Sequence, residues 1–387
     1  MSRKYKLHPG DYELGENEKF YSDMEAKGWR LVKRGAHFSR FEPVEPSNAR
    51  YRIEVFSPGF LDQSVLPEEQ LAVFEDCGWE YVTDRWVLHI FRAPAGSDAP
   101  EFYTDPAQQA ETLRHMKRGA VWGWIPAIIV SVLLILLNIS VRASLGGMNR
   151  VMGEFLVQFV QIPSLFLFCG FMLLQGIYRT VRDACIITRT YRRLKKGIPL
   201  DHNPEKRHTV HKLITRTLTG LAVLCLLLLV AQLITTRSTY LPPETEDPYL
   251  LLSELGWEGE RTSFMNKDSS MTHTRSPLSD YWDTREYMEA YSGGGPQMYQ
   301  DVYRLRDGRM AYTLADALMK SATFGDGGRN FVPVESNAVD AAWATRLEVV
   351  AVKGPYVAYI SYHPGGSGDF DPQVLCATLG AKWAEEP

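Results

Sequence analysis

Three long apolar runs in the middle of the chain constrain its fold more than any other feature of the sequence. They span residues 121–141, 155–178 and 218–235, and none of them contains an Asp, Glu, Lys or Arg. About 20 helical residues cross the hydrocarbon core of a bilayer, where lipid offers the backbone no hydrogen-bond partner. We therefore expect three transmembrane helices.

The basic residues that flank these runs are distributed unevenly. The connection 179–212 contains ten Lys and Arg residues, whereas the connection after the first run contains only Arg142 and Arg150. Basic residues are retained on the cytoplasmic side of a membrane. The asymmetry predicts a multi-pass protein of the cell membrane with its N-terminus in the cytoplasm and its C-terminal domain outside. The first residues contain no apolar signal-peptide core, which fits this orientation.

The region before the membrane, residues 1–105, contains an internal repeat. The stretch from Met24 to Trp29 resembles the stretch from Phe74 to Trp79, and the similarity continues for more than ten residues without a gap. Each copy contains a strand-like run, a helical stretch that ends in glycine, and a hairpin-like pair that begins at tryptophan. We expect a cytoplasmic α+β domain made of a duplicated β-α-β-β unit.

Four residues of the repeat are its structural markers: Gly28, Trp29, Gly78 and Trp79. The glycines lie where the C-terminus of a helix favours a positive φ. Core packing is the favoured role of the two tryptophans, and a ligand-binding box is the alternative. Two further residues, Glu25 and Glu75, would either be solvated acids at the helix ends or form a carboxylate pair near a pseudo-twofold axis.

Three motifs carry a resemblance to a known family. The runs 51–56, 75–82 and 100–106 are similar to domain-of-unknown-function family 2812, and the resemblance covers roughly residues 1–120. It implies a bacterial membrane protein in which this domain precedes the membrane helices, in a regulatory or stress-response setting. It implies no catalytic activity.

Two further segments complete the predicted architecture. Residues 106–120 form a linker helix with Asp105 as its N-cap, and residues 121–237 hold the membrane region. Residues 238–387 form an extracytoplasmic α+β domain with an antiparallel sheet. It contains a strand near 299–305, a helix over 310–322, a hairpin over 347–362 and a final helix over 372–383. The fold class is thus α+β soluble domains flanking an α-helical three-span membrane region.

The basic connection also has a helical pattern over residues 179–196. Five cations recur at spacings of three and four residues and form one stripe: Arg179, Arg182, Arg189, Arg193 and Lys196. Such a stripe attracts anionic lipid headgroups by roughly 1 kcal/mol per charge near the surface. The nearby set His202, Glu205, His208 and His211 is disfavoured as a metal site, because the neighbouring Lys and Arg residues repel a cation.

The sequence contains none of the common catalytic motifs. We expect no catalytic residues, no cofactor and no bound metal, and the net charge of −4 does not favour nucleic acid. The architecture predicts a non-enzymatic membrane-bound sensor or adaptor that links an outer domain to a cytoplasmic one, in a regulatory or envelope-stress setting. The alternative is an accessory subunit of a transporter or envelope complex. The expected partners are the lipid bilayer, anionic lipid headgroups and one or more unidentified proteins.

Overall fold

The computed structural model describes residues 3–56, 66–204, 209–263, 268–289, 295–322, 331–365 and 370–385. Within these ranges the side chains of 145, 146, 209, 210 and 212 are not described. The chain forms two compact units, which are described separately. The first comprises residues 1–130 and 173–216, and the second comprises residues 131–172 and 217–387.

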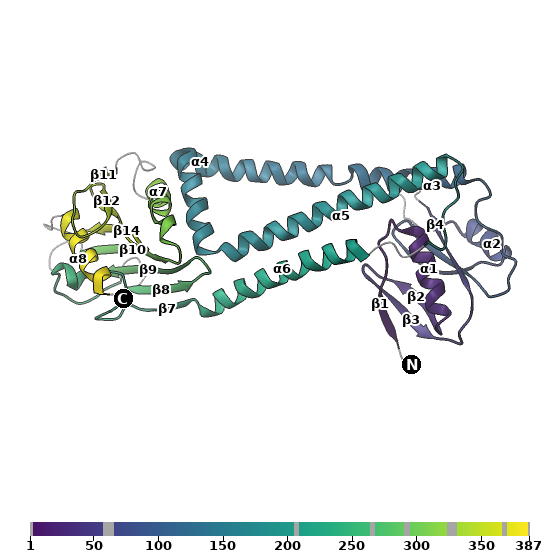
Figure 1. Cartoon of the computed structure of the whole chain (residues 1–387), viewed down its shortest axis with the longest axis horizontal. Helices are drawn as coiled ribbons and strands as arrows, with labels where there is room; N and C mark the ends of the chain where they lie inside the picture. The colour runs from purple at the N-terminus through teal and green to yellow at the C-terminus, as the bar shows by residue number, and fades with distance from the viewer. Residues whose placement is uncertain are drawn as a thin grey trace. The chain divides into compact units, whose positions relative to one another are not determined.

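The first unit begins with a β-α-β-β segment (Figure 1). Strands β1 (Lys4–Leu7), β2 (Trp29–Arg34) and β3 (Phe38–Pro43) form an antiparallel sheet in the order β1-β3-β2. Helix α1 (Leu14–Glu25) connects β1 to β2. We refer to this three-stranded sheet as sheet A.

The next segment has the same order of elements and the same order of strands. Strands β4 (Arg50–Val55), β5 (Glu80–Arg85) and β6 (Leu88–Ala93) pair antiparallel in the order β4-β6-β5, and helix α2 (Glu68–Asp76) follows β4. We call this sheet B. Its ladder shifts register between Tyr81 and Thr83, and the ladder of sheet A shifts between Leu31 and Lys33, fifty residues earlier.

The two predicted glycines end the two helices. Gly28 has a φ of 80° and Gly78 a φ of 87°, the left-handed region that favours glycine because it has no Cβ. Space also constrains Gly28, since a Cβ at that position would lie 3.0 Å from the carbonyl oxygen of Val44.

The core of the first unit lies between α1, the two sheets and two further helices. Tyr21 of α1 packs against Phe41 of sheet A and Tyr51 of sheet B, with ring centroids 6.4 and 5.8 Å apart. Helix α3 (Pro106–Trp122) adds buried residues to the same core. The side chain of Asp105 accepts a 2.8 Å hydrogen bond from the backbone N–H of Ala107, which confirms the predicted N-cap.

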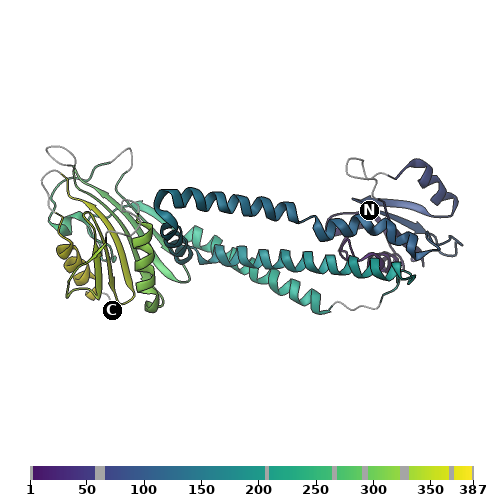
Figure 2. The same cartoon turned by 90° about the horizontal axis from the view of Figure 1, so that it is seen from above.

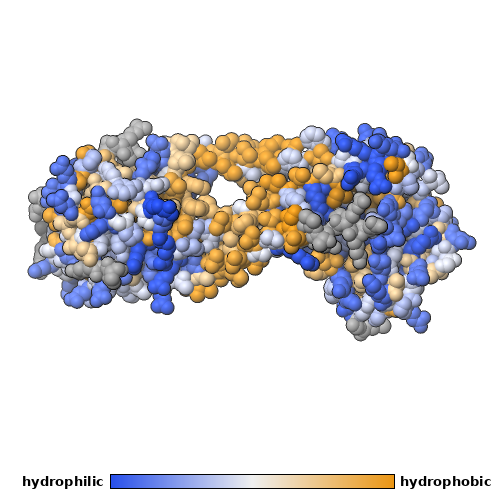
Figure 3. Space-filling model, viewed as in Figure 1, coloured by the Kyte–Doolittle hydropathy of each residue, from blue (hydrophilic) through white to orange (hydrophobic). Residues whose placement is uncertain are grey.

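Three helical stretches are long and apolar enough to cross a membrane: Pro106–Ser144, Pro163–Lys195 and Leu213–Thr235. They comprise α3 with the first part of α4 (Ile125–Gln161), then α5 (Pro163–Lys195) and α6 (Thr209–Thr235). Only Gly123 and Trp124 separate α3 from α4. Apolar side chains gather over α4, α5 and α6 (Figure 3). Together these features indicate an integral membrane protein.

The second predicted run, 155–178, is divided between two helices. Helix α4 contains a non-helical residue at Gly147 and ends at Gln161, and α5 begins at Pro163. Val157 and Val160 of α4 pack into the core of the C-terminal domain, and Val160 is buried. The second span therefore begins at Pro163, a residue suited to the first turn of a helix because its missing N–H has no intrahelical partner there.

The second unit contains an eight-stranded antiparallel sheet in the order β11-β12-β13-β14-β10-β9-β8-β7. Helices α7 (Ala311–Ser321) and α8 (Pro372–Glu385) pack into different core clusters on opposite sides of it (Figure 2). The predicted hairpin, helix and final helix are confirmed as β13–β14, α7 and α8. The strands are β7 (Arg237–Tyr240), β8 (Ser270–Arg275), β9 (Ser279–Tyr287), β10 (Gln297–Leu305), β11 (Val332–Pro333), β12 (Ala341–Ala344), β13 (Glu348–Lys353) and β14 (Tyr356–His363).

Candidate functional site

Helices α3 and α5, which belong to two of the candidate spans, complete the core of the N-terminal domain. Ile187, Tyr191 and Leu194 of α5 are buried in the same cluster as Leu113 and Met116 of α3. Fully burying one such side chain contributes about 1.5–3 kcal/mol. The domain and these two helices therefore form one packed body.

An ion pair joins the start of α1 to α5. Glu13, the residue before α1, accepts a 2.8 Å hydrogen bond from the N–H of Gly10 and a second one from the guanidinium of Arg182. Both charged side chains are mostly buried. Arg182 was predicted to contact lipid headgroups. The structure places it against the N-terminal domain instead, because a carboxylate lies within its reach.

The other four members of the basic stripe are exposed. Arg189 and Arg193 line a cleft of about 600 Å³, which Gly15 and Glu16 of α1 also line. Arg179 and Lys196 do not line it. Charged residues of both signs border the cleft, which makes it polar.

The loop after α5, residues 197–204, lies against the first turn of α1. A Cβ built on Gly15 would lie 2.0 Å from the carbonyl oxygen of Asp201, so only glycine allows this approach. Lys19 of α1 donates a 3.1 Å hydrogen bond to the carbonyl of Pro204. The second half of the loop is thus fixed to α1.

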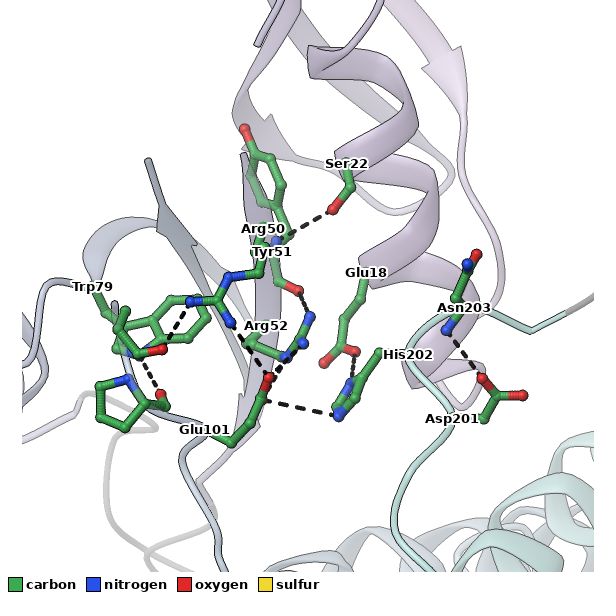
Figure 4. A network of polar contacts seen from close by, with 12 residues as sticks. Glu18, Ser22, Arg50, Tyr51, Arg52, Trp79, Glu101, Asp201, His202 and Asn203 are labelled. Atoms are coloured by element: carbon green, nitrogen blue, oxygen red, sulfur yellow. Dashed lines mark hydrogen bonds and ion pairs between the residues drawn. The ribbon is translucent and has the colours of Figure 1, made fainter. Parts of the chain in front are cut away.

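His202 of this loop lies between two carboxylates (Figure 4). Its Nδ1 is 2.5 Å from Oε2 of Glu18 and its Nε2 is 3.9 Å from Oε2 of Glu101. Glu18 is 1% exposed, and its other oxygen accepts a 2.9 Å hydrogen bond from the N–H of Ile53 in sheet B. Glu18 therefore joins α1, sheet B and the loop after α5.

The network continues through Glu101 to the second tryptophan of the repeat (Figure 4). Arg52 holds Glu101 in a bidentate pair, at 2.7 and 2.6 Å. Arg50 lies 3.7 Å from the same carboxylate and 5.6 Å from the ring centroid of Trp79. The indole N–H of Trp79 donates a 2.9 Å hydrogen bond to the carbonyl of Pro100.

The two tryptophans differ in burial. Trp79 is 1% exposed, which fits core packing, whereas Trp29 is only partly buried and lies under the ammonium of Lys4, 4.3 Å from its ring centroid. Core packing therefore describes Trp79, whereas Trp29 packs against the core of the domain but stays partly exposed. Trp79 gains its burial from the segment 97–103, which packs over it through Ala99 and Phe102.

Glu75 is a solvated acid at the end of α2, as one interpretation expected, but neither interpretation holds for Glu25. Glu75 is exposed, whereas Glu25 is fully buried and held by Arg92 of β6 at 2.6–3.0 Å. The hydroxyl of Tyr51 donates a further 2.5 Å hydrogen bond to Glu25. Burial disfavours the charged form, but the hydrogen bonds from Arg92 and Tyr51 outweigh it and hold the pKa of Glu25 below its usual range.

Another buried carboxylate lies on sheet B. Glu54 is 6% exposed, and the hydroxyl of Tyr103 donates a 2.5 Å hydrogen bond to it. Burial raises its pKa to about 7. His89 lies directly opposite on β6 and is also buried, and burial lowers the pKa of its imidazole.

In the second unit, a chain of polar contacts joins the sheet to the ends of two helices. The hydroxyl of Tyr281 donates a 2.6 Å hydrogen bond to Asp301, and the rings of Tyr281 and Tyr303 stack at 4.6 Å. Gln161 at the end of α4 donates to the Tyr303 hydroxyl at 2.7 Å, and Gln232 of α6 donates to the carbonyl of Gln161 at 2.6 Å. Burial raises the pKa of Asp301 to about 6.

Among the described residues, no group of three or more His, Cys, Asp or Glu side chains could hold a metal ion. Of the set considered in the sequence, His202 binds Glu18, and His211 stacks on Tyr178 with ring centroids 5.5 Å apart. Glu205 and His208 lie outside the described residues.

These features define a class: a multi-span membrane protein whose N-terminal α+β domain is packed against its own membrane-length helices. Residues 13–125 match the family described as Protein of unknown function (DUF2812), which confirms the predicted resemblance for the N-terminal part of the chain. The matched segment begins at Glu13, includes α3 and ends at Ile125. No curated protein and no solved structure matches the chain.

Proposed function

We propose that the protein is a non-enzymatic membrane sensor or adaptor. In this account the C-terminal domain receives a signal outside the cell, and the DUF2812 domain passes it to a cytoplasmic protein. The observation that carries the proposal is the shared core of the N-terminal domain, in which α5 supplies Ile187, Tyr191 and Leu194. A shift of α5 would disturb that core directly, because packed interiors transmit displacement.

The second unit supports the proposal from its own side. Val160 of α4 is buried among strands of the eight-stranded sheet, and Gln161 and Gln232 are hydrogen-bonded at the ends of α4 and α6. A ligand that changes this sheet would act on the helix ends. Such coupling requires a ligand with different affinities for two states of the domain.

The proposal also includes the internal repeat of the N-terminal domain and the orientation of the chain in the membrane. The two β-α-β-β segments are an internal repeat, supported by their equal strand order and the matching register shifts. The N-terminal domain is cytoplasmic, supported by the ten basic residues of 179–212.

Cysteine labelling tests the orientation. Native Cys376 is buried, so it cannot serve as the reporter, and a chain without native cysteines is needed. Single cysteines replace Ser263 and Lys195, which are both exposed. An impermeant maleimide should label position 263 in intact cells and position 195 only after lysis. The opposite pattern would reverse the orientation.

Affinity purification tests the adaptor function. The full chain is isolated from native membranes in mild detergent, beside His202→Ala, which disturbs the contact between α1 and the loop, and Asn203→Ala as a matched control. We expect a cytoplasmic protein to co-purify with the wild type and the control and to be reduced with His202→Ala. No cytoplasmic protein with any of the three would contradict the adaptor function.

One observation favours the alternative, an accessory subunit of a transporter or envelope complex. The most apolar windows of the three spans are only 6%, 6% and 17% buried by the described residues, so most of their surface is free for lipid or for other membrane helices. A stable complex with a multi-span protein in mild detergent would support this role.

Anionic lipid headgroups are the proposed ligands of the exposed part of the basic stripe. Arg189 and Arg193 carry this proposal, because both are exposed and line the polar cleft beside α1. Vesicles with and without phosphatidylserine test it. The double variant Arg189→Gln/Arg193→Gln should lose its preference for the anionic vesicles.

A further inference from the structure

The outer face of sheet A is exposed, although the equivalent face of sheet B is core. The pairings Tyr5 with Arg40 and Leu7 with Phe38 place these four side chains on one face of sheet A. Tyr5, Leu7 and Phe38 are 60%, 66% and 56% exposed. We call this surface, together with Lys33, the free face.

The ladder of sheet B has the same pairing. Ile53 pairs with Ile90 and Val55 with Leu88, at the positions that Tyr5, Arg40, Leu7 and Phe38 occupy in sheet A. All four residues of sheet B are buried in the cluster to which α1, α3 and α5 contribute. Three apolar side chains of the free face are thus exposed at positions whose counterparts in sheet B are buried under helices.

The charges of the free face indicate an anionic occupant. Lys33 and Arg40 are directly opposite each other on β2 and β3, an arrangement of like charges that destabilises a sheet. Neither side chain has an ion pair with any described residue. A carboxylate-bearing partner would relieve the repulsion.

Helix α2 carries the complementary surface. Leu71 and Phe74 lie on the side of α2 that packs against sheet B, and none of the nine residues of α2 is buried. Glu69, Val73 and Asp76 recur at spacings of four and three residues on the opposite side, and all three are exposed. Asp76 also lies at the C-terminal end of α2, where the helix dipole disfavours an anion.

The arrangement of the two β-α-β-β segments connects these two surfaces. The helix of the first segment, α1, contacts sheet B as well as sheet A. If α2, the helix of the second segment, also contacted both sheets, it would lie on the free face of sheet A. We propose that α2 of a second copy of this chain covers the free face, and that the reciprocal contact closes a twofold dimer.

Charge reversal in the full chain, purified in mild detergent, tests the dimer. Lys33→Glu/Arg40→Glu and Glu69→Lys/Asp76→Lys should each weaken association about tenfold or more, because like charges then face each other. Combining all four substitutions should restore association. Lys33, Glu69 and Asp76 are exposed and Arg40 is half-buried, so recovery of association in the combined variant also shows that these substitutions do not unfold the domain.

Cross-linking of mixed chains locates the contact. In a background without native cysteines, chains with Phe38→Cys are mixed with differently tagged chains with Val73→Cys. Oxidation should join the two tags, whereas Lys27→Cys, an exposed control beyond α1, should not replace Phe38→Cys. A chain that stays monomeric, or a monomer that binds phosphatidylserine vesicles through Lys33 and Arg40, would overturn the proposal.

Discussion

The imidazole of His202 lies 2.5 Å from the carboxylate of Glu18, and the two residues are 184 positions apart in the sequence. Glu18 belongs to α1 and contacts sheet B, whereas His202 belongs to the loop that follows α5. The contact therefore fixes the end of a membrane-length helix to the centre of the N-terminal domain. Because Glu18 is buried, its partner contributes to stability as well as to position.

Replacing His202 by alanine should destabilise the N-terminal domain by about 1–3 kcal/mol, the usual cost of an unsatisfied buried group. Thermal melts of the full chain in detergent measure this loss. Asn203→Ala removes an exposed neighbour and should leave the melting temperature unchanged. Adding Glu18→Gln to His202→Ala should recover part of the loss, since a neutral amide costs less to bury. Equal melts for the two alanine variants would contradict the role of the contact.

Trp79→Ala should lower the stability of the full chain by about 3–5 kcal/mol, the usual cost of removing a large buried aromatic side chain. Trp29→Ala should cost clearly less, because its indole is only partly buried. The full chain is required, since α5 contributes to the core of the domain. Two equal losses would show that Trp29 is packed as tightly as Trp79.

Glu54 should make the stability of the domain depend on pH. The pKa of Glu54 is about 7 in the folded chain and 4.5 for an ordinary glutamate, so the folded state binds the proton more tightly. The contribution of Glu54 to stability is therefore fully present below about pH 4.5 and is lost as the pH rises through 7, by up to about 3 kcal/mol.

The Glu54→Gln variant isolates this effect. Its stability relative to wild type should increase between pH 5 and pH 8, measured by melts in detergent. Comparing the two chains removes most of the separate contribution of His89. Glu75→Gln, at an exposed glutamate, is the matched control and should follow the wild type. A constant difference between Glu54→Gln and wild type would exclude a raised pKa.

Local signals predicted the elements well. The glycine after each helix, the Asp105 cap and the alternating strands of the C-terminal domain each depend on residues close in sequence. The start of the second span was missed, because hydropathy cannot distinguish Val157 and Val160 in a protein core from the same residues in lipid.

The polar site was predictable only in part. Leu14, Glu18, Tyr21 and Glu25 recur at helical spacing, so the sequence places two carboxylates on the apolar side of α1. It does not indicate their partners, since Arg92 and His202 lie 67 and 184 residues away and only the tertiary fold brings them close. The difference between Trp29 and Trp79 has the same origin, because the segment that covers Trp79 comes from a connection outside the repeat.

The central claim is that a change in the C-terminal domain reaches the N-terminal domain through the helices. Hydrogen–deuterium exchange on the full chain in nanodiscs tests it with Tyr303→Phe, which removes the hydrogen bond to Gln161 at the end of α4. Tyr362→Phe is the matched control, because its hydroxyl contacts Trp257 instead. We predict that Tyr303→Phe, and not Tyr362→Phe, changes exchange in α1 and in residues 197–204. Changes confined to the C-terminal domain in both variants would contradict the claim.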